Sequence, residues 1–143
     1  MRYFEHFSSS EIFTNCSNDE ILSCIQHGFL DNLLYLFDFL NDFRDYLDSP
    51  IKITSTFRSF GHNKRVGGVE YSQHLIGQAV DFCFPDMPHD TAVCILRDFF
   101  HLSAKKSHLG CVIIYDKFIH IGLRTSSHPN FQIYDKRKLE KSN

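Results

Sequence analysis

The sequence predicts a single α+β domain with a central antiparallel sheet and flanking helices. Helical patterns come first along the chain, and strand patterns with one further helix between them follow. The 143 residues are 43% hydrophobic and 22% charged, which is typical of one ordinary globular domain. We expect the domain to cover residues 1–135 and the charged residues 136–143 to form a C-terminal tail.

The first part of the chain predicts two helices. Leucine and phenylalanine recur every three or four positions over residues 29–47, which is the apolar stripe of an amphipathic helix. Pro50 ends this helix, because the residue before a proline is pushed out of the helical region. A shorter helix is expected over residues 18–26, closing at Gly28.

The middle of the chain predicts two strands separated by a loop. Alternating side chains predict a strand at residues 51–56, and residues 78–84 predict another. Residues 57–73 hold three glycines among polar side chains, so we interpret them as a functional loop without regular structure. Two prolines then stop the second strand and start another helix, with Asp86 as its expected cap.

Two later apolar segments, residues 110–114 and 118–123, predict a β-hairpin. Alternate side chains of a strand share one face, so Asp81 points away from Val80 and Phe82. By the same rule, His120 points away from the isoleucines on either side of it. Asp81 and His120 therefore lie on the less apolar faces of two strands that can be neighbours.

Charge, cysteine content and the N-terminal segment exclude several classes of protein. A net charge of -2, from 15 basic and 17 acidic residues, gives no electrostatic footprint for nucleic acid. The five cysteines form no C-x-x-C pair, and their odd number argues against a complete disulfide framework. The N-terminal segment is too polar for a signal peptide, and no run approaches the ~20 apolar residues of a membrane span. We therefore expect a protein that is cytoplasmic as synthesised. We also expect a monomer, although nothing in these features determines the oligomeric state.

One stretch, from Ser72 to Asp81, has the pattern of a metal site. It places the imidazole of His74 seven residues before the carboxylate of Asp81, and His120 adds a second imidazole in a later strand. Three protein ligands with a fourth position left for water are the usual arrangement of a catalytic zinc site. Taken singly, His74 and Asp81 also fit a capped loop and a surface carboxylate, and His120 also fits a hydrogen-bonded core residue.

Together these residues resemble the zinc D-alanyl-D-alanine carboxypeptidase family, which includes VanY-like enzymes and phage endolysins. The resemblance covers roughly residues 3–124 and is carried by Ile53-Thr54-Ser55-Thr56-Phe57-Arg58-Ser59, His62-Asn63, Val66-Gly67-Gly68, Ser72-Gln73-His74-Leu75-Ile76-Gly77-Gln78-Ala79-Val80-Asp81 and Phe118-Ile119-His120. It implies that His74, Asp81 and His120 bind Zn²⁺, in a fold shared with lysostaphin-type peptidases and the hedgehog signalling domain. The implied substrates are peptidoglycan stem peptides.

The resemblance also implies two substrate-binding residues. Arg58 matches an arginine that holds substrate carboxylate or carbonyl groups, a role suited to a planar fork that is always charged. An ordinary ion pair with an acid is the alternative for Arg58. Ser72, close to the metal ligands in sequence, is expected to hydrogen-bond the substrate backbone.

The sequence departs from the family at the residue that transfers protons. Many members carry an acid three positions before the second zinc histidine, and some small relatives carry an aspartate two positions after it. Here these positions are Lys117 and Gly122. Asp116 is our first substitute for the general base, and Glu70 is the second.

The sequence therefore predicts a zinc metallopeptidase that cuts D-alanyl amide bonds in peptidoglycan stem peptides or cross-links. Without a signal peptide, such an enzyme is expected to reach the cell wall after lysis or release, which favours a phage origin. Two alternatives stay open. One is a zinc-binding module of the same fold that binds peptidoglycan or signals with little or no catalysis, and the other is a metal-free structural protein.

Overall fold

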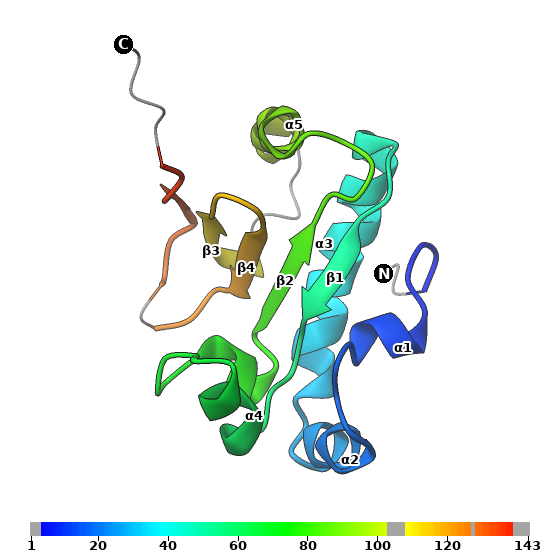
Figure 1. Cartoon of the computed structure of the whole chain (residues 1–143), viewed down its shortest axis with the longest axis vertical. Coiled ribbons are helices and arrows are strands. Elements are labelled where there is room, and N and C mark those ends of the chain that lie inside the picture. The colour runs from blue at the N-terminus through cyan, green and yellow to red at the C-terminus, as the bar shows by residue number, and fades with distance from the viewer. Residues whose placement is uncertain (1–3, 103–107, 127, 139–143) are drawn as a thin grey trace.

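The computed structural model describes residues 4–102, 108–126 and 128–138. Of the expected tail at residues 136–143, residues 139–143 lie outside this description. The predicted α+β class is confirmed, because one five-stranded sheet packs against a layer of helices (Figure 1). None of the helices in the described ranges combines the length and apolarity that a membrane crossing requires.

The sheet has the strand order β1-β2-β4-β3-β5. Its strands are β1 (Lys52–Ser55), β2 (Ala79–Cys83), β3 (Leu109–Ile114), β4 (Ile119–Leu123) and β5 (Gln132–Asp135). The first four strands pair antiparallel, as expected, and the predicted hairpin is β3 and β4. The sheet as a whole is mixed, because β5 pairs with β3 in the parallel direction. This edge strand was not predicted.

The helices follow the predicted pattern in part. They are α1 (Ser9–Ile12), α2 (Asn18–Gln26), α3 (Leu30–Leu47), α4 (Phe60–Arg65), the 3-10 helix η1 (Gln73–Ile76) and α5 (His89–Leu102). The predictions for α2 and α3 are confirmed to within one residue. The prediction that residues 57–73 lack regular structure is wrong, since α4 lies within them and η1 begins at their last residue. The capping role of Asp86 is also wrong, because α5 begins three residues later, at His89.

The glycine-rich composition of residues 57–73 argued against a helix there. The α4 helix forms nevertheless, because its first turn is capped. The Ser59 side chain accepts a hydrogen bond from the backbone N–H of His62, which satisfies one of the free donors at the helix start. The η1 helix is capped in the same way, by Ser72.

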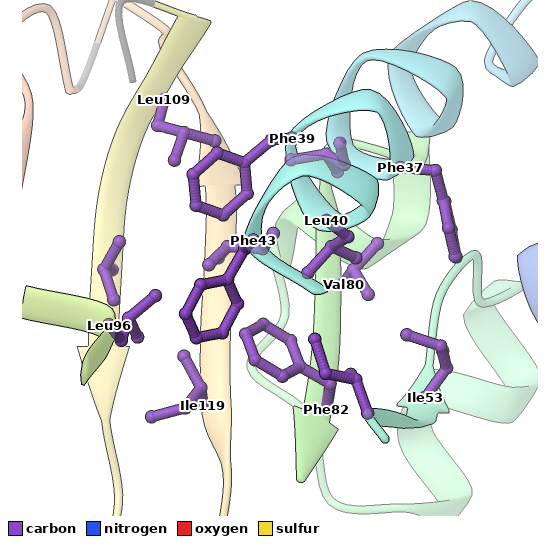
Figure 2. Close-up of a cluster of buried hydrophobic side chains, with 14 of the residues drawn as sticks. Phe37, Phe39, Leu40, Phe43, Ile53, Val80, Phe82, Leu96, Leu109 and Ile119 are labelled. Atoms are coloured by element: carbon purple, nitrogen blue, oxygen red, sulfur yellow. The ribbon is translucent and has the colours of Figure 1, made fainter. Parts of the chain in front are cut away.

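The hydrophobic core lies between α3 and the sheet. Figure 2 shows Phe39, Leu40 and Phe43 of α3 beside Val80 and Phe82 of β2, and all five side chains are fully or almost fully buried. Ile119 of β4 and Leu96 of α5 extend the same cluster. Each such side chain contributes about 1.5–3 kcal/mol of transfer free energy on burial. This packing fixes which face of β2 and β4 is covered by α3, and therefore which face is left for other chemistry.

Candidate metal centre

Two of the predicted ligands lie directly opposite each other on neighbouring strands. Asp81 of β2 pairs with His120 of β4 in the antiparallel register. The flanking side chains Val80 and Ile121 are fully buried against α3, so Asp81 and His120 point to the other face of the sheet. His120 Nδ1 lies 2.8 Å from Asp81 Oδ1. The predicted facing of both side chains is therefore confirmed.

The third predicted ligand, His74, comes from η1. Its Nδ1 lies 2.6 Å from the carbonyl oxygen of Thr56, and its own carbonyl accepts the backbone N–H of Arg58 at 3.0 Å. A carbonyl can only accept, so Nδ1 carries the proton and the lone pair is on Nε2. His74 Nε2 faces Asp81 and lies 3.1 Å from Oδ2. The loop after β1 thus orients this imidazole toward the sheet.

The turn after η1 requires a glycine. Gly77 has a left-handed conformation, with φ of +68°, and a Cβ there would lie 2.9 Å from the backbone oxygen of Phe29. This close approach lets the chain pass from His74 into β2 within a few residues.

Together the three side chains form a set of donors that fits a metal ion. One atom each from His74, Asp81 and His120 lies within 4.8 Å of the other two. His74 is 2% exposed and Asp81 7% exposed. His74 Nε2 is buried and forms no hydrogen bond of good geometry with any described residue, despite its approach to Asp81. A buried nitrogen lone pair in this state is costly unless it binds something, and two imidazoles with a carboxylate suit zinc.

The electrostatics of the cluster favour a positive charge at its centre. Burial alone would raise the pKa of the Asp81 carboxyl, but its hydrogen bond with His120 and the close approach of His74 hold that pKa far below its usual range. Burial would likewise lower the pKa of His120, but Asp81 and, to a lesser degree, Cys111 more than offset this and raise it to about 9. The carboxylate therefore stays ionised at neutral pH and stabilises cations beside it.

Arg58 contacts the same carboxylate from the β1 side. Its Nη2 lies 3.4 Å from Asp81 Oδ2, while Nε donates to Ser55 Oγ at 2.9 Å and Nη1 donates to Asn63 Oδ1 at 3.2 Å. Gly68 makes this arrangement possible, since a Cβ there would lie 2.0 Å from Asn63 Oδ1. Arg58 therefore braces Asp81. Its predicted role toward substrate stays a prediction.

The other predicted site residues lie around this cluster and not within it. Ser72 Oγ accepts the backbone N–H of His74 at 3.2 Å, and Ser72 and Arg58 both line a largely apolar cleft of about 570 Å³. Asp116 accepts the backbone N–H of Lys138 at 2.8 Å. Glu70 is exposed and lines a separate hollow beside α4. The roles of Ser72, Asp116 and Glu70 remain predictions.

Glu20 also supports the site, a contribution that was not predicted from the sequence. One oxygen of its buried carboxylate accepts the backbone N–H of Ser17, and the other accepts the N–H of Ser59 at 2.9 Å and Nδ1 of His62 at 3.0 Å. Burial alone would raise the pKa of Glu20, but these donors lower it to about 2. The spacing Ser17-x-x-Glu20 is a capping-box pattern, which predicts the bond to Ser17 but not the one to Ser59.

Comparison with known proteins agrees with this geometry. The model of one protein family, Peptidase M15, matches residues 5–122. The matched range contains the three candidate ligands and most of the sheet. A search among curated proteins gave no match.

Proposed function

We propose that this chain, which belongs to the peptidase M15 family of zinc D-alanyl-D-alanine carboxypeptidases, hydrolyses D-alanyl amide bonds in peptidoglycan stem peptides or cross-links. The family supports a metallopeptidase, and the convergence of His74, Asp81 and His120 supports the metal site. The observation that carries the proposal is the buried, unpartnered Nε2 of His74 facing an ionised carboxylate. A histidine kept only for stability would be expected to have that nitrogen hydrogen-bonded.

In this proposal, His74, Asp81 and His120 would hold the ion. When bound, zinc supplies a Lewis acid and lowers the pKa of water toward about 7. The protein's own part is to hold the ligands rigidly. Thr56 fixes the tautomer of His74, and Arg58 fixes the carboxylate of Asp81.

The cleft beside Arg58 and Ser72 is the proposed substrate site. Its walls include Phe57, Tyr71 and Leu75, which suit the methyl groups and backbone of a small peptide. Arg58 is bonded to Ser55, Asn63 and Asp81 through one nitrogen each, and a guanidinium has five N–H donors. It therefore keeps donors for a substrate carboxylate or carbonyl while it braces the metal ligand.

Proton transfer is proposed to involve Asp116 first and Glu70 second. Asp116 lies in the turn between β3 and β4, and using it as a base requires its bond to the Lys138 N–H to open. Asp116→Asn and Glu70→Gln test the two residues separately. Replacing the carboxylate of the true base by an amide should lower the rate of cleavage about 10²–10⁴-fold. The same replacement at the other residue should change the rate little.

The experiment that tests the whole proposal is mass spectrometry of muropeptides released from purified sacculi. The zinc-loaded protein, the chelated protein and zinc-loaded His74→Ala are incubated in parallel. Fragments that appear only with the zinc-loaded wild-type protein establish a metallopeptidase, and the mass lost identifies the bond. Full activity and stoichiometric zinc in His74→Ala would refute the ligand set.

A zinc-binding module without catalysis is the second candidate, and the space around Gly122 favours it. A Cβ at this position would lie 2.3 Å from Gln73 Oε1, so Gln73 fills the place where small relatives carry an aspartate. Lys117 likewise replaces the other expected acid. If this candidate is correct, the protein will bind zinc and sediment with sacculi but release no fragments.

A further inference from the structure

The aromatic ring of Tyr115 lies on the same face of the sheet as the metal cluster. Its backbone N–H donates to the carbonyl of Phe118 at 3.0 Å, which continues the β3–β4 pairing beyond Ile114 and Ile119. Those two isoleucines are fully buried in the core. Because side chains alternate, Tyr115 and Phe118 point to the opposite face, where His120 also lies.

Two contacts hold the body of the Tyr115 ring in place. It stacks on Phe118, with ring centroids 4.5 Å apart and an angle of 16° between the planes. Lys136, which follows β5, places its Nζ 6.0 Å from the ring centroid. Phe118 immediately precedes β4 and lies two residues before His120 on the same face of the sheet, so the stacked ring is fixed beside a candidate ligand.

The Tyr115 hydroxyl has no hydrogen-bond partner among residues 4–102, 108–126 and 128–138. Burial raises the pKa of this phenol, and the charges of Asp81 and Cys111 raise it further. Tyr115 therefore lies on the same face of the sheet as the cluster, and its hydroxyl stays protonated at neutral pH. A fixed, neutral O–H donor without a protein partner is suited to a ligand oxygen.

We propose that Tyr115 is a catalytic residue whose hydroxyl donates a hydrogen bond to the scissile carbonyl oxygen as this oxygen gains negative charge. The inference rests on the proposed function and adds a group that had no predicted role. A preorganised donor aimed at developing charge stabilises the transition state more than the ground state. The proton stays on Tyr115 throughout, so the residue complements a general base and does not replace it.

The variant Tyr115→Phe separates this role from a structural one. Phenylalanine keeps the stack on Phe118 and removes only the hydroxyl. We expect kcat to fall about 10²-fold or more while KM stays within about threefold, because the lost bond forms mainly in the transition state. Zinc content and melting temperature should not change. Tyr46→Phe is the matched control, since Tyr46 packs on Phe99 in the helical layer and should leave all four quantities unchanged.

A second readout uses binding instead of turnover. A phosphinate analogue of the D-alanyl amide carries a charged oxygen where the carbonyl oxygen would develop its charge. Calorimetry should show that Tyr115→Phe binds it about 10²-fold more weakly than the wild-type protein.

The outcomes distinguish this inference from the proposed function. Wild-type kcat and wild-type phosphinate affinity in Tyr115→Phe would overturn the role of Tyr115 and leave the peptidase proposal intact. A loss of zinc or of melting temperature in this variant would also overturn it, in favour of a structural role. If the wild-type protein neither cleaves sacculi nor binds the phosphinate, the proposed function fails and the inference fails with it.

Discussion

The carbonyl oxygen of Thr56 and Nδ1 of His74 are 2.6 Å apart, and this contact sets the direction of the imidazole. Because the carbonyl accepts a hydrogen bond from Nδ1–H, the lone pair is on Nε2 and is directed at Asp81. A backbone carbonyl behind a metal-binding histidine is a common way to fix its tautomer and raise its basicity. The contact comes from backbone, so no side-chain substitution at Thr56 removes it directly.

Replacing His74 should abolish metal binding. His74→Ala removes one of three ligands and is expected to lower zinc occupancy to background and the rate of cleavage by at least about 10³-fold. Elemental analysis of the dialysed protein measures the first quantity, and the muropeptide assay measures the second. His101→Ala, on the exposed end of α5, is the control and should match the wild-type protein.

Replacing Arg58 should weaken zinc binding, in addition to any effect that it has on substrate binding. Arg58→Lys keeps the charge but cannot contact Ser55, Asn63 and Asp81 together, so Asp81 loses its brace. We expect a fall of about 10–100-fold in zinc affinity, measured by competition with a chromophoric chelator.

The control for the Arg58 experiment is Arg97→Lys. Arg97 pairs with Asp135 near the surface at 3.2 Å, and its replacement should leave zinc affinity unchanged. Unchanged affinity in Arg58→Lys would show that Asp81 needs no brace, and Arg58 would then serve substrate alone.

The stability of the fold should fall in acid because of Glu20. Its pKa is about 2 in the folded protein and has an ordinary value of 4.5, so folding favours the ionised form. This contribution is fully present above about pH 4.5 and is lost as the pH falls toward 2. Denaturant titrations between pH 7 and pH 2.5 should show this loss in the wild-type protein.

Glu20→Gln should show a lower free energy of unfolding at pH 7 and a weaker dependence on pH below 4.5. The two carboxylate oxygens of Glu20 accept hydrogen bonds from Ser17, Ser59 and His62. Glutamine has one acceptor oxygen in place of two, so it cannot keep all three bonds. Glu11→Gln is the control, because Glu11 caps α1 locally through Ser8. A pH dependence identical to that of the wild-type protein would assign the acid sensitivity to other carboxylates.

Adding a side chain at Gly122 should disturb Gln73 first. The new Cβ would lie 2.3 Å from Gln73 Oε1 and 3.0 Å from Cys111 Sγ. Gln73 ends in a flexible amide, so we expect it to swing away and lose its bond to the Leu123 carbonyl, at a cost of about 1 kcal/mol in Gly122→Ala.

A double-mutant cycle tests this explanation for Gly122. In a Gln73→Ser background, Gly122→Ala should cost measurably less, because the crowding atom is gone. Equal costs in both backgrounds would place the conflict at Cys111 instead.

The elements that the sequence predicted well have strong repeating patterns. The stripe of α3 and the hairpin of β3 and β4 each have a buried face defined by several apolar residues, so their type and position follow from periodicity. The facing of Asp81 and His120 followed from the same rule. The spacing of His74 and Asp81 suggested that these residues share a metal site with His120, and the resemblance of the chain to a known family supported this set.

The missed elements are short and depend on contacts with other segments. β5 has four residues, none of them buried, and is held by its parallel pairing to β3. The α4 helix depends on the cap from Ser59, whose N–H in turn binds Glu20 from 39 residues earlier. Local pattern carries little information about such elements, because their stability comes from partners distant in the sequence.

The order of the ligands along the chain has a consequence for how the protein acquires its metal. Asp81 and His120 are 39 residues apart, and they meet only when β4 adds to β2. Such non-local pairing forms late relative to helices, because a long loop must close first. During synthesis, a ribosome-bound chain without β4 offers only His74 and Asp81. Competence to hold zinc with all three ligands therefore requires the pairing of β4 with β2 and is absent from any fragment that lacks β4.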